Sequence, residues 1–446
     1  MLTITAVIAL SLQMIAPYLI WRSRWNIPTH LAAGFCVTAY VIPGLFTDVW
    51  DRFSDDTILL FTQINAVGAV SLCIGIFLGN SIGARTQASP IAIAKRLRYD
   101  PGKLIWRVML VVTVATIGIY LSYWVMGFIP MFAEDPFSAK QFKGIYRDMY
   151  YRAAYPFRFS FSILSATIPL ILVLAWLKRS PYLMMLATFA FLAIFVSLAR
   201  AATATGVLFF LGVLAARSQL GMRWYYPLVL LVFPFGSVFY YMLGHVLEVQ
   251  ALQSAYVGES FSDYISSGAP DIADQLGWLY GFMSGDYYSM GRTMYGGLVP
   301  GNYQWNPSVW TLTFNDVGAD ISEMVTGGLR LSAGEWGYAN FGWYGVVGIP
   351  MLSGLFNGLM LQRIKSALPV MNTIQITVAL MLYSTLGMQI VQFYFLSIHN
   401  IPAIAVAVFF WLAVIRKKSV RVPTPARRPT GRPVPRAQPS SPPARG

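Results

Sequence analysis

Long, nearly uninterrupted apolar segments follow one another along most of this chain, and they constrain its fold more than any other feature. A helix needs about 20 predominantly apolar residues to cross the hydrocarbon core of a bilayer. Eleven segments meet this description, near residues 2–20, 29–47, 57–83, 107–132, 159–177, 181–199, 201–216, 225–246, 337–361, 370–396 and 401–415. The sequence therefore predicts an all-α polytopic membrane protein with about eleven transmembrane helices.

Composition supports this class. Charged residues make up 11% of the chain and apolar residues 56%, whereas soluble domains are about a quarter charged. The segments 181–199 and 201–216 are short and separated only by Arg200, so the number of spans falls by one if they form a single crossing. Cys36 and Cys73 both lie inside predicted spans, which argues against a disulfide framework or a cysteine metal site. No cleavable signal peptide is expected, because the first segment lacks a basic n-region.

The distribution of charge predicts an orientation. Basic residues gather in the cytoplasmic connections of membrane proteins. If the loop 84–107 and the tail 416–446 are cytoplasmic, most of the 32 basic residues lie on that side and all of the 18 acids except Asp100 lie outside. We therefore expect a multi-pass protein of a bacterial cytoplasmic (inner) membrane, with the N-terminus outside and the C-terminus in the cytoplasm.

Four regions follow from this arrangement. Residues 1–246 are expected to hold transmembrane helices one to eight, 247–336 a large external (periplasmic) loop, and 337–415 helices nine to eleven. The tail 416–446 has nine basic residues, many prolines and no acids. Such a composition cannot bury enough apolar area to fold, so we expect a disordered cytoplasmic segment with no role in nucleic-acid binding.

The external loop between Glu134 and Phe159 is basic on the side where basic residues are rare. It contains Lys140, Lys143, Arg147, Arg152 and Arg158. The first three fall at i, i+3 and i+7, which predicts one face of a helix. Arginine forks suit the phosphate oxygens of an anionic ligand, and the neighbouring tyrosines suit sugar rings. The alternative is an interfacial helix whose cations reach lipid phosphates.

Arg200 is the most sharply placed single charge. It stands between two apolar segments with no polar loop to hold it in water. A charge at membrane depth commonly marks a substrate path. The alternative is a tight external turn from which the arginine reaches the headgroups.

The large external loop offers further binding candidates. Arg292 and Arg330 both lie beside glycines, which allow a close approach of backbone to ligand. Asp271 and Asp274 are spaced as one helix face, as are Asp316, Asp320 and Glu323; such acids could hold a cation, but a solvated helix face explains them equally. We predict no metal site and no cofactor.

Two side chains are candidate general bases at the external face. Glu335 precedes a span by only a few residues in mostly apolar surroundings, where a buried carboxyl suits the deprotonation of a sugar hydroxyl. His399 lies at the outer end of the last hairpin. For each, the alternative is a structural contact.

The segment Gly334-Glu335-Trp336-Gly337-Tyr338-Ala339-Asn340-Phe341-Gly342 resembles the region after the large external loop in Wzy-type polymerases of O-antigen and related polysaccharides. Arg200 at the start of a span and the segment 297–300 are also similar to that family, although Gly301 and Asn302 stand where a basic residue is common. The resemblance implies a GT-C-like fold and glycosyltransferase activity on oligosaccharide units carried by polyprenyl pyrophosphate.

By that resemblance, Arg200, Arg292 and Arg330 would bind the pyrophosphate, and Glu335 or His399 would deprotonate the acceptor hydroxyl. Partners would be membrane lipids, the lipid-linked oligosaccharide, and flippase and chain-length regulator proteins. Two alternatives remain: an O-antigen ligase, which uses the same donor with another acceptor, and a transporter or flippase of lipid-linked saccharide. A transporter commonly shows internal repeats and charges through the depth of the bundle, and the sequence has neither.

Overall fold

A computed structural model describes residues 1–415 of the protein, except 87–96, 98–99, 247–264, 266–268, 286–287, 303 and 316–327. These described residues form helices and no strands. The α-helices are α1 (Leu2–Ile15), α2 (Ile27–Cys36), α3 (Ile42–Phe46), α4 (Asp55–Arg85), α6 (Pro101–Met126), α7 (Pro136–Gln141), α8 (Ile145–Tyr151), α9 (Ala154–Lys178), α10 (Pro181–Phe195), α11 (Arg200–Ala215), α12 (Gln219–Val246), α15 (Asp271–Met283), α16 (Arg292–Gly296), α17 (Pro307–Asn315), α18 (Ala333–Ala367), α19 (Thr373–Leu382), α20 (Met388–Val391) and α21 (Ile401–Val414).

Seven helical segments of the described chain are long and apolar enough to cross a membrane: 2–19, 27–46, 55–85, 101–132, 154–178, 333–370 and 373–391. Three shorter apolar helices, at 181–195, 202–215 and 398–414, occupy the places of three further predicted spans. Helix α12 (Gln219–Val246) occupies the place of the eighth. An all-α membrane protein is thus confirmed at this level, while eleven crossings stay a prediction.

Helices α4 and α18 pack closely against each other, because glycines line both contact faces. A β-carbon at Gly75 or Gly79 of α4 would lie 2.0 or 2.1 Å from a carbonyl oxygen of α18. Conversely, β-carbons at Gly354 and Gly358 of α18 would lie 2.2 and 2.3 Å from carbonyl oxygens of α4. Small residues spaced four apart let helix backbones approach in a membrane, where van der Waals packing drives association.

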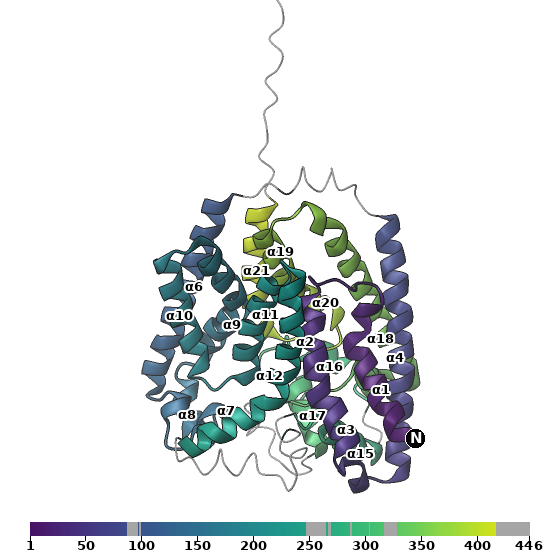
Figure 1. The fold of residues 1–446 in the computed structure, drawn as a ribbon. Coiled ribbons are helices and arrows are strands. Elements are labelled where there is room, and N and C mark those ends of the chain that lie inside the picture. Colours follow the sequence, from purple (N-terminus) through teal and green to yellow (C-terminus); the bar gives the residue numbers. More distant parts are fainter. Residues whose placement is uncertain are drawn as a thin grey trace, which may run out of the picture. The chain divides into compact units, whose positions relative to one another are not determined.

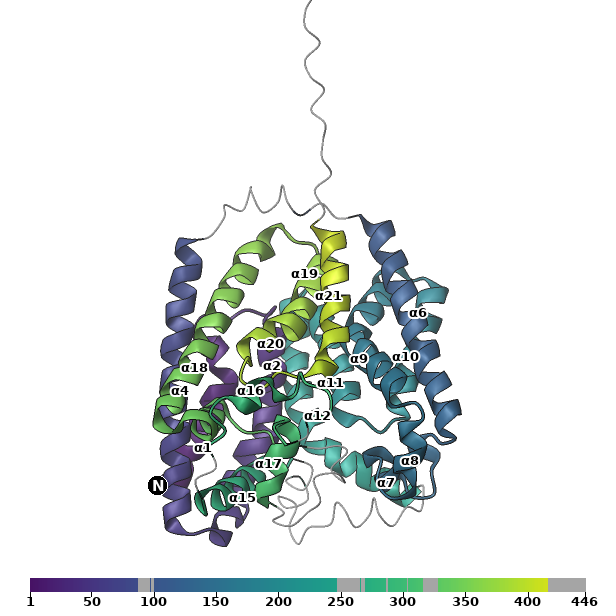
Figure 2. The ribbon, with the colours of Figure 1, turned by 180° about the vertical axis from the view of Figure 1, so that it is seen from behind.

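The remaining long helices pack into two further groups. One buried cluster joins α6, α9, α10, α19 and α21, and another joins α2, α11 and α12 with part of α19. The short helices α7, α8, α15 and α17 lie together at one end of this bundle (Figures 1 and 2). The first residues of α6 and the last of α21 lie at the opposite end.

Two local predictions from the sequence are wrong. Lys140, Lys143 and Arg147 do not share one helix, because α7 ends at Gln141 and α8 begins at Ile145. Gly144 between them has a φ of +57°, a left-handed conformation that interrupts a helix. The ninth predicted span also begins earlier, at Ala333, so that Glu335 lies in the first turn of α18.

Helices α10 and α11 are too short to cross the membrane from face to face in straight form. With 15 and 16 residues they are each about 23 Å long, against a hydrocarbon core of about 30 Å. The turn that joins them is buried: Leu198 is 1% exposed and Ser197 6%. The backbone of Arg200 thus begins α11 directly after a buried turn.

Candidate functional site

A cavity of about 1030 Å³ lies where α9, α11, the π-helical turn Tyr383–Gly387, the turn Ile398–Asn400 and the segment 297–309 meet. We call it the central cavity. Its volume is at the upper end of the range of small-molecule sites, about 300–1,000 Å³. The described residues that line it include lysine, arginine and histidine but no aspartate or glutamate. The central cavity is therefore suited to an anionic ligand.

The polar wall of the central cavity brings together two predicted site residues from distant parts of the sequence. Arg158, in the first turns of α9, donates from Nη1 to His399 Nε2 at 3.3 Å. Its Nε donates to the hydroxyl of Tyr150, and its guanidinium lies over the Tyr150 ring at 5.2 Å from the centroid. Lys140 lines the same cavity. Arginine forks bind phosphate oxygens in pairs, so this wall has the chemistry of a phosphate site.

The position of His399 is fixed by backbone contacts from two sides. The hydroxyl of Ser162 on α9 donates to the His399 carbonyl at 2.9 Å, and Ser397 caps the His399 amide at 3.3 Å. The preceding residue, Ile398, donates its amide to the carbonyl of Gly297 at 3.0 Å. A β-carbon at Gly297 would lie 2.3 Å from the Leu396 carbonyl oxygen, so this close approach requires glycine.

Partial burial, and then the positive charge of Arg158, lower the pKa of His399 below its ordinary value. The imidazole is therefore neutral near pH 7, as a general base must be. Because its Nε2 accepts from Arg158, the proton of this neutral ring lies on Nδ1. Nε2 can accept a proton from a ligand once Arg158 has turned to another acceptor.

The far wall of the central cavity is apolar. It is formed by side chains of α2, α9, α11, α19 and α21, namely Leu31, Phe161, Ala166, Pro169, Phe209, Met381 and Ala403. Three tyrosines, Tyr150, Tyr151 and Tyr155, also line the cavity. A ligand that fills the whole cavity must accordingly carry both an anionic and an apolar part.

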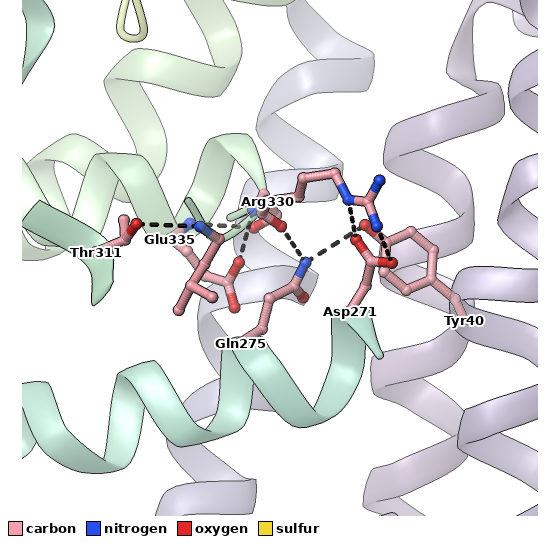
Figure 3. A network of polar contacts seen from close by, with 8 residues as sticks. Tyr40, Asp271, Gln275, Thr311, Arg330 and Glu335 are labelled. Carbon is pink, nitrogen blue, oxygen red and sulfur yellow. Dashed lines mark hydrogen bonds and ion pairs between the residues drawn. The ribbon is translucent and has the colours of Figure 1, made fainter. Parts of the chain in front are cut away.

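Glu335 does not line the central cavity. It is fully buried and caps its own helix: its Oε2 accepts the Ser332 amide at 2.6 Å, while the Ser332 hydroxyl accepts the Glu335 amide at 3.1 Å (Figure 3). Its other carboxylate oxygen, Oε1, lies beside the Asn65 side chain. This oxygen forms no hydrogen bond with a described residue. This reciprocal capping box is a structural role that the sequence Ser-x-x-Glu indicates.

Arg330 also has a structural contact. Its Nε and Nη2 donate to the two carboxylate oxygens of Asp271 at 2.6 and 2.9 Å (Figure 3). Its guanidinium also lies over the Phe35 ring. The Arg330 carbonyl accepts from Gln275 Nε2 at 2.5 Å. Burial raises the pKa of Asp271 although Arg330 opposes the shift, and burial with the nearby Asp271 raises the pKa of Asp274 to about 6.

The segment 334–342 ends in a tight turn between two helical parts of α18. Phe341 and Gly342 have non-helical dihedral angles, and Gly342 has a φ of +58°. A β-carbon at Gly337 would lie 2.2 Å from the Gly345 carbonyl oxygen, so the two parts of α18 lie against each other. Asn340 Oδ1 accepts from Ser289 at 2.5 Å and from Thr293 at 3.0 Å. These hydrogen bonds hold Ser289 and Thr293 against α18.

The other predicted binding residues lie apart from the polar wall. Arg147 and Arg152 lie on or next to α8 and do not line the central cavity, and Arg292 is exposed with its guanidinium 4.8 Å from the Trp305 ring centroid. Arg200 begins α11 between Ala199 and Ala202, which both line the cavity. Its side chain lies outside the described part of the structure, as do Asp316, Asp320 and Glu323.

Sequence reasoning missed most of the cavity wall. Ser162, Asn302 and Asn306 contribute polar groups, and the apolar wall consists of residues indistinguishable in sequence from the rest of the scaffold. The only signals were Gly297 and Pro300, which mark irregular backbone, and the tyrosines next to Arg158.

Comparisons of the chain with protein-family models, with curated proteins and with solved structures gave no match.

Proposed function

We propose that this protein is a membrane glycosyltransferase that polymerises oligosaccharide repeat units carried on polyprenyl pyrophosphate, at the outer face of the cytoplasmic membrane. One observation carries the proposal: the central cavity joins a polar wall, with the cations Lys140 and Arg158 and the neutral base His399, to an apolar wall between membrane helices. A polyprenyl pyrophosphate has the same two parts, a doubly charged head and a hydrocarbon chain. The apolar helices on every side support a membrane-borne substrate.

The chemistry assigns a role to each member of the polar wall. Lys140 and Arg158 bind the pyrophosphate. When Arg158 turns to the pyrophosphate, Nε2 of His399 becomes available to an acceptor hydroxyl. His399 takes the hydroxyl proton, the acceptor oxygen bonds to the anomeric carbon of the donor sugar, and the bond from that carbon to the pyrophosphate oxygen breaks. Polyprenyl pyrophosphate leaves.

This assignment places the base at His399 and leaves Glu335 with its helix-capping role. The GT-C-like fold belongs to the same proposal. Arg292 and Arg330 do not line the central cavity; they contact Trp305 and Asp271.

The test is deletion of the gene, with the length of surface polysaccharide read on a gel. Wild type should restore the ladder of repeat units, and His399→Gln and Arg158→Gln should not, at equal protein levels. Arg52→Gln is the matched control, because Arg52 is exposed at the same end and does not line the central cavity.

The other outcomes identify the alternatives. If full-length polymer forms in the deletion strain but stays on its lipid carrier, the protein is a ligase. If lipid-linked units accumulate inside the cell and none reach the surface, it is a transporter.

A further inference from the structure

A second pocket, of about 420 Å³, lies at the end of the bundle opposite α15 and α17. Two segments far apart in the sequence form it: the connection between α1 and α2, and the first turns of α12. We call it the arginine pocket. Its lining residues are Arg22, Ser23, Arg24, Gln219, Met222, Arg223 and Tyr226.

Three positive charges converge on the arginine pocket. Arg22, Arg24 and Arg223 are all exposed, and the described residues that line the pocket include no acid. None of the three forms an ion pair with a described residue. Like charges held on one small pocket repel each other, so a bound anion would stabilise the arrangement. Ser23 and Gln219 supply neutral polar groups beside them.

An apolar surface leads away from the arginine pocket along α12. Tyr226, Leu230 and Leu231 are exposed and lie three, seven and eight residues after Arg223, which places them on the face of the helix that carries this arginine. Trp224 is 75% exposed, and tryptophan is enriched at the membrane interface. The face therefore continues from the level of the arginines toward the hydrocarbon core.

We propose that the arginine pocket binds the phosphodiester headgroup of an anionic glycerophospholipid, with the acyl chains along the exposed face of α12. The arginine forks bind the phosphate oxygens, and the apolar face meets the chains. Basic pockets between membrane helices on the cytoplasmic side bind anionic headgroups. The site is separate from the central cavity and does not depend on the function proposed for it.

The experiment uses the purified full-length protein and native mass spectrometry, with phosphatidylglycerol or phosphatidylcholine added to the detergent. Wild type should retain phosphatidylglycerol in preference to phosphatidylcholine. Replacing Arg22, Arg24 and Arg223 together by Gln should remove that preference, since each arginine strengthens anionic-lipid binding by about 5-fold. Arg223→Lys keeps the charge but loses the fork, so it should lower the preference for phosphatidylglycerol by an intermediate amount. This variant provides the test if the triple variant fails to fold.

The matched control is Lys178→Gln/Arg179→Gln/Arg217→Gln, which removes three exposed charges outside the pocket. It should retain the lipid as wild type does. Equal loss in the pocket variant and the control would overturn the proposal, because binding would then follow net charge alone. So would displacement of the lipid by inorganic phosphate at equal concentration, which would make the ligand a soluble phosphate.

Discussion

At the scale of single residues, the pair Arg158 and His399 is the contact on which the proposed chemistry depends. Partial burial and then the guanidinium keep the imidazole neutral, and the guanidinium at the same time occupies its Nε2. Such a pair can act as a base only after an anion has drawn the arginine away. Ligand binding and base activation are thus coupled through one hydrogen bond.

This coupling predicts a pH dependence. A base must be unprotonated, so activity falls as the pH drops through the pKa of His399, and the lowered pKa places this acidic limb below 6.5. Arg158→Gln removes one of the two causes that lower the pKa, so in any residual activity the limb should move to higher pH. The measurement is the pH profile of kcat/KM in proteoliposomes with lipid-linked donor, because kcat/KM reports the free enzyme, in which Arg158 contacts His399. An unchanged acidic limb in the Arg158→Gln variant would show that a group other than His399 causes the fall in activity.

Glu335 gives a second prediction at this scale. Glu335→Gln keeps an oxygen that can accept the Ser332 amide, and should retain both the unfolding midpoint and polymerisation. Glu335→Ala loses the capping box and should lower the free energy of unfolding by about 1 kcal/mol. Thermal unfolding in detergent and the glycan ladder provide the two readouts. A stable Glu335→Gln variant without polymer would return Glu335 to the catalytic role that the sequence predicted.

At the scale of elements, the glycine-lined contact of α4 and α18 holds the turn at Phe341–Gly342 in place. The first turns of α18 lie against α4 through Gly334, whose added β-carbon would be 2.9 Å from the Ile64 carbonyl oxygen. Glycines in membrane helices are common, and their spacing in one helix does not tell which partner helix they face. Only the packed structure identifies α18 as the partner of α4.

Substitution of one glycine tests this contact. Gly354→Ala should lower the free energy of unfolding by about 1–3 kcal/mol, because its β-carbon would lie 2.2 Å from the Leu72 carbonyl oxygen. Gly348→Ala in the same helix is the control: nothing lies within 4 Å of the added carbon, and alanine favours a helix by up to about 1 kcal/mol. Equal unfolding midpoints for the two variants would contradict the packing argument.

At the scale of the whole molecule, the short helices α7, α8, α15 and α17 lie at one end of the bundle, as the sequence requires if both polar loops are external. The membrane orientation itself stays a prediction from charge. Because the central cavity is lined by residues from this end, the orientation decides on which side of the membrane the proposed reaction takes place.

Cysteine labelling tests the orientation. In a variant without Cys36 and Cys73, Asp51→Cys should react with an impermeant maleimide in intact cells, because Asp51 is exposed at the predicted outer end. Ser366→Cys, in the last turn of α18, should react only after the membrane is opened. The reverse labelling pattern would show that the orientation is opposite to the predicted one, with the cavity cations on the cytoplasmic side.

The sequence by itself determined the features that depend on residues close together in the chain. Segment length and apolarity predicted the membrane class and the places of the long helices, and Ser332 with Glu335 carries the signature of a helix cap. The central cavity was decided only by the tertiary structure. Arg158 and His399 are 241 residues apart, and the apolar wall between them is built from side chains that look like any other lipid-facing residue. A membrane sequence specifies which residues are apolar, but packing decides which of them enclose a ligand.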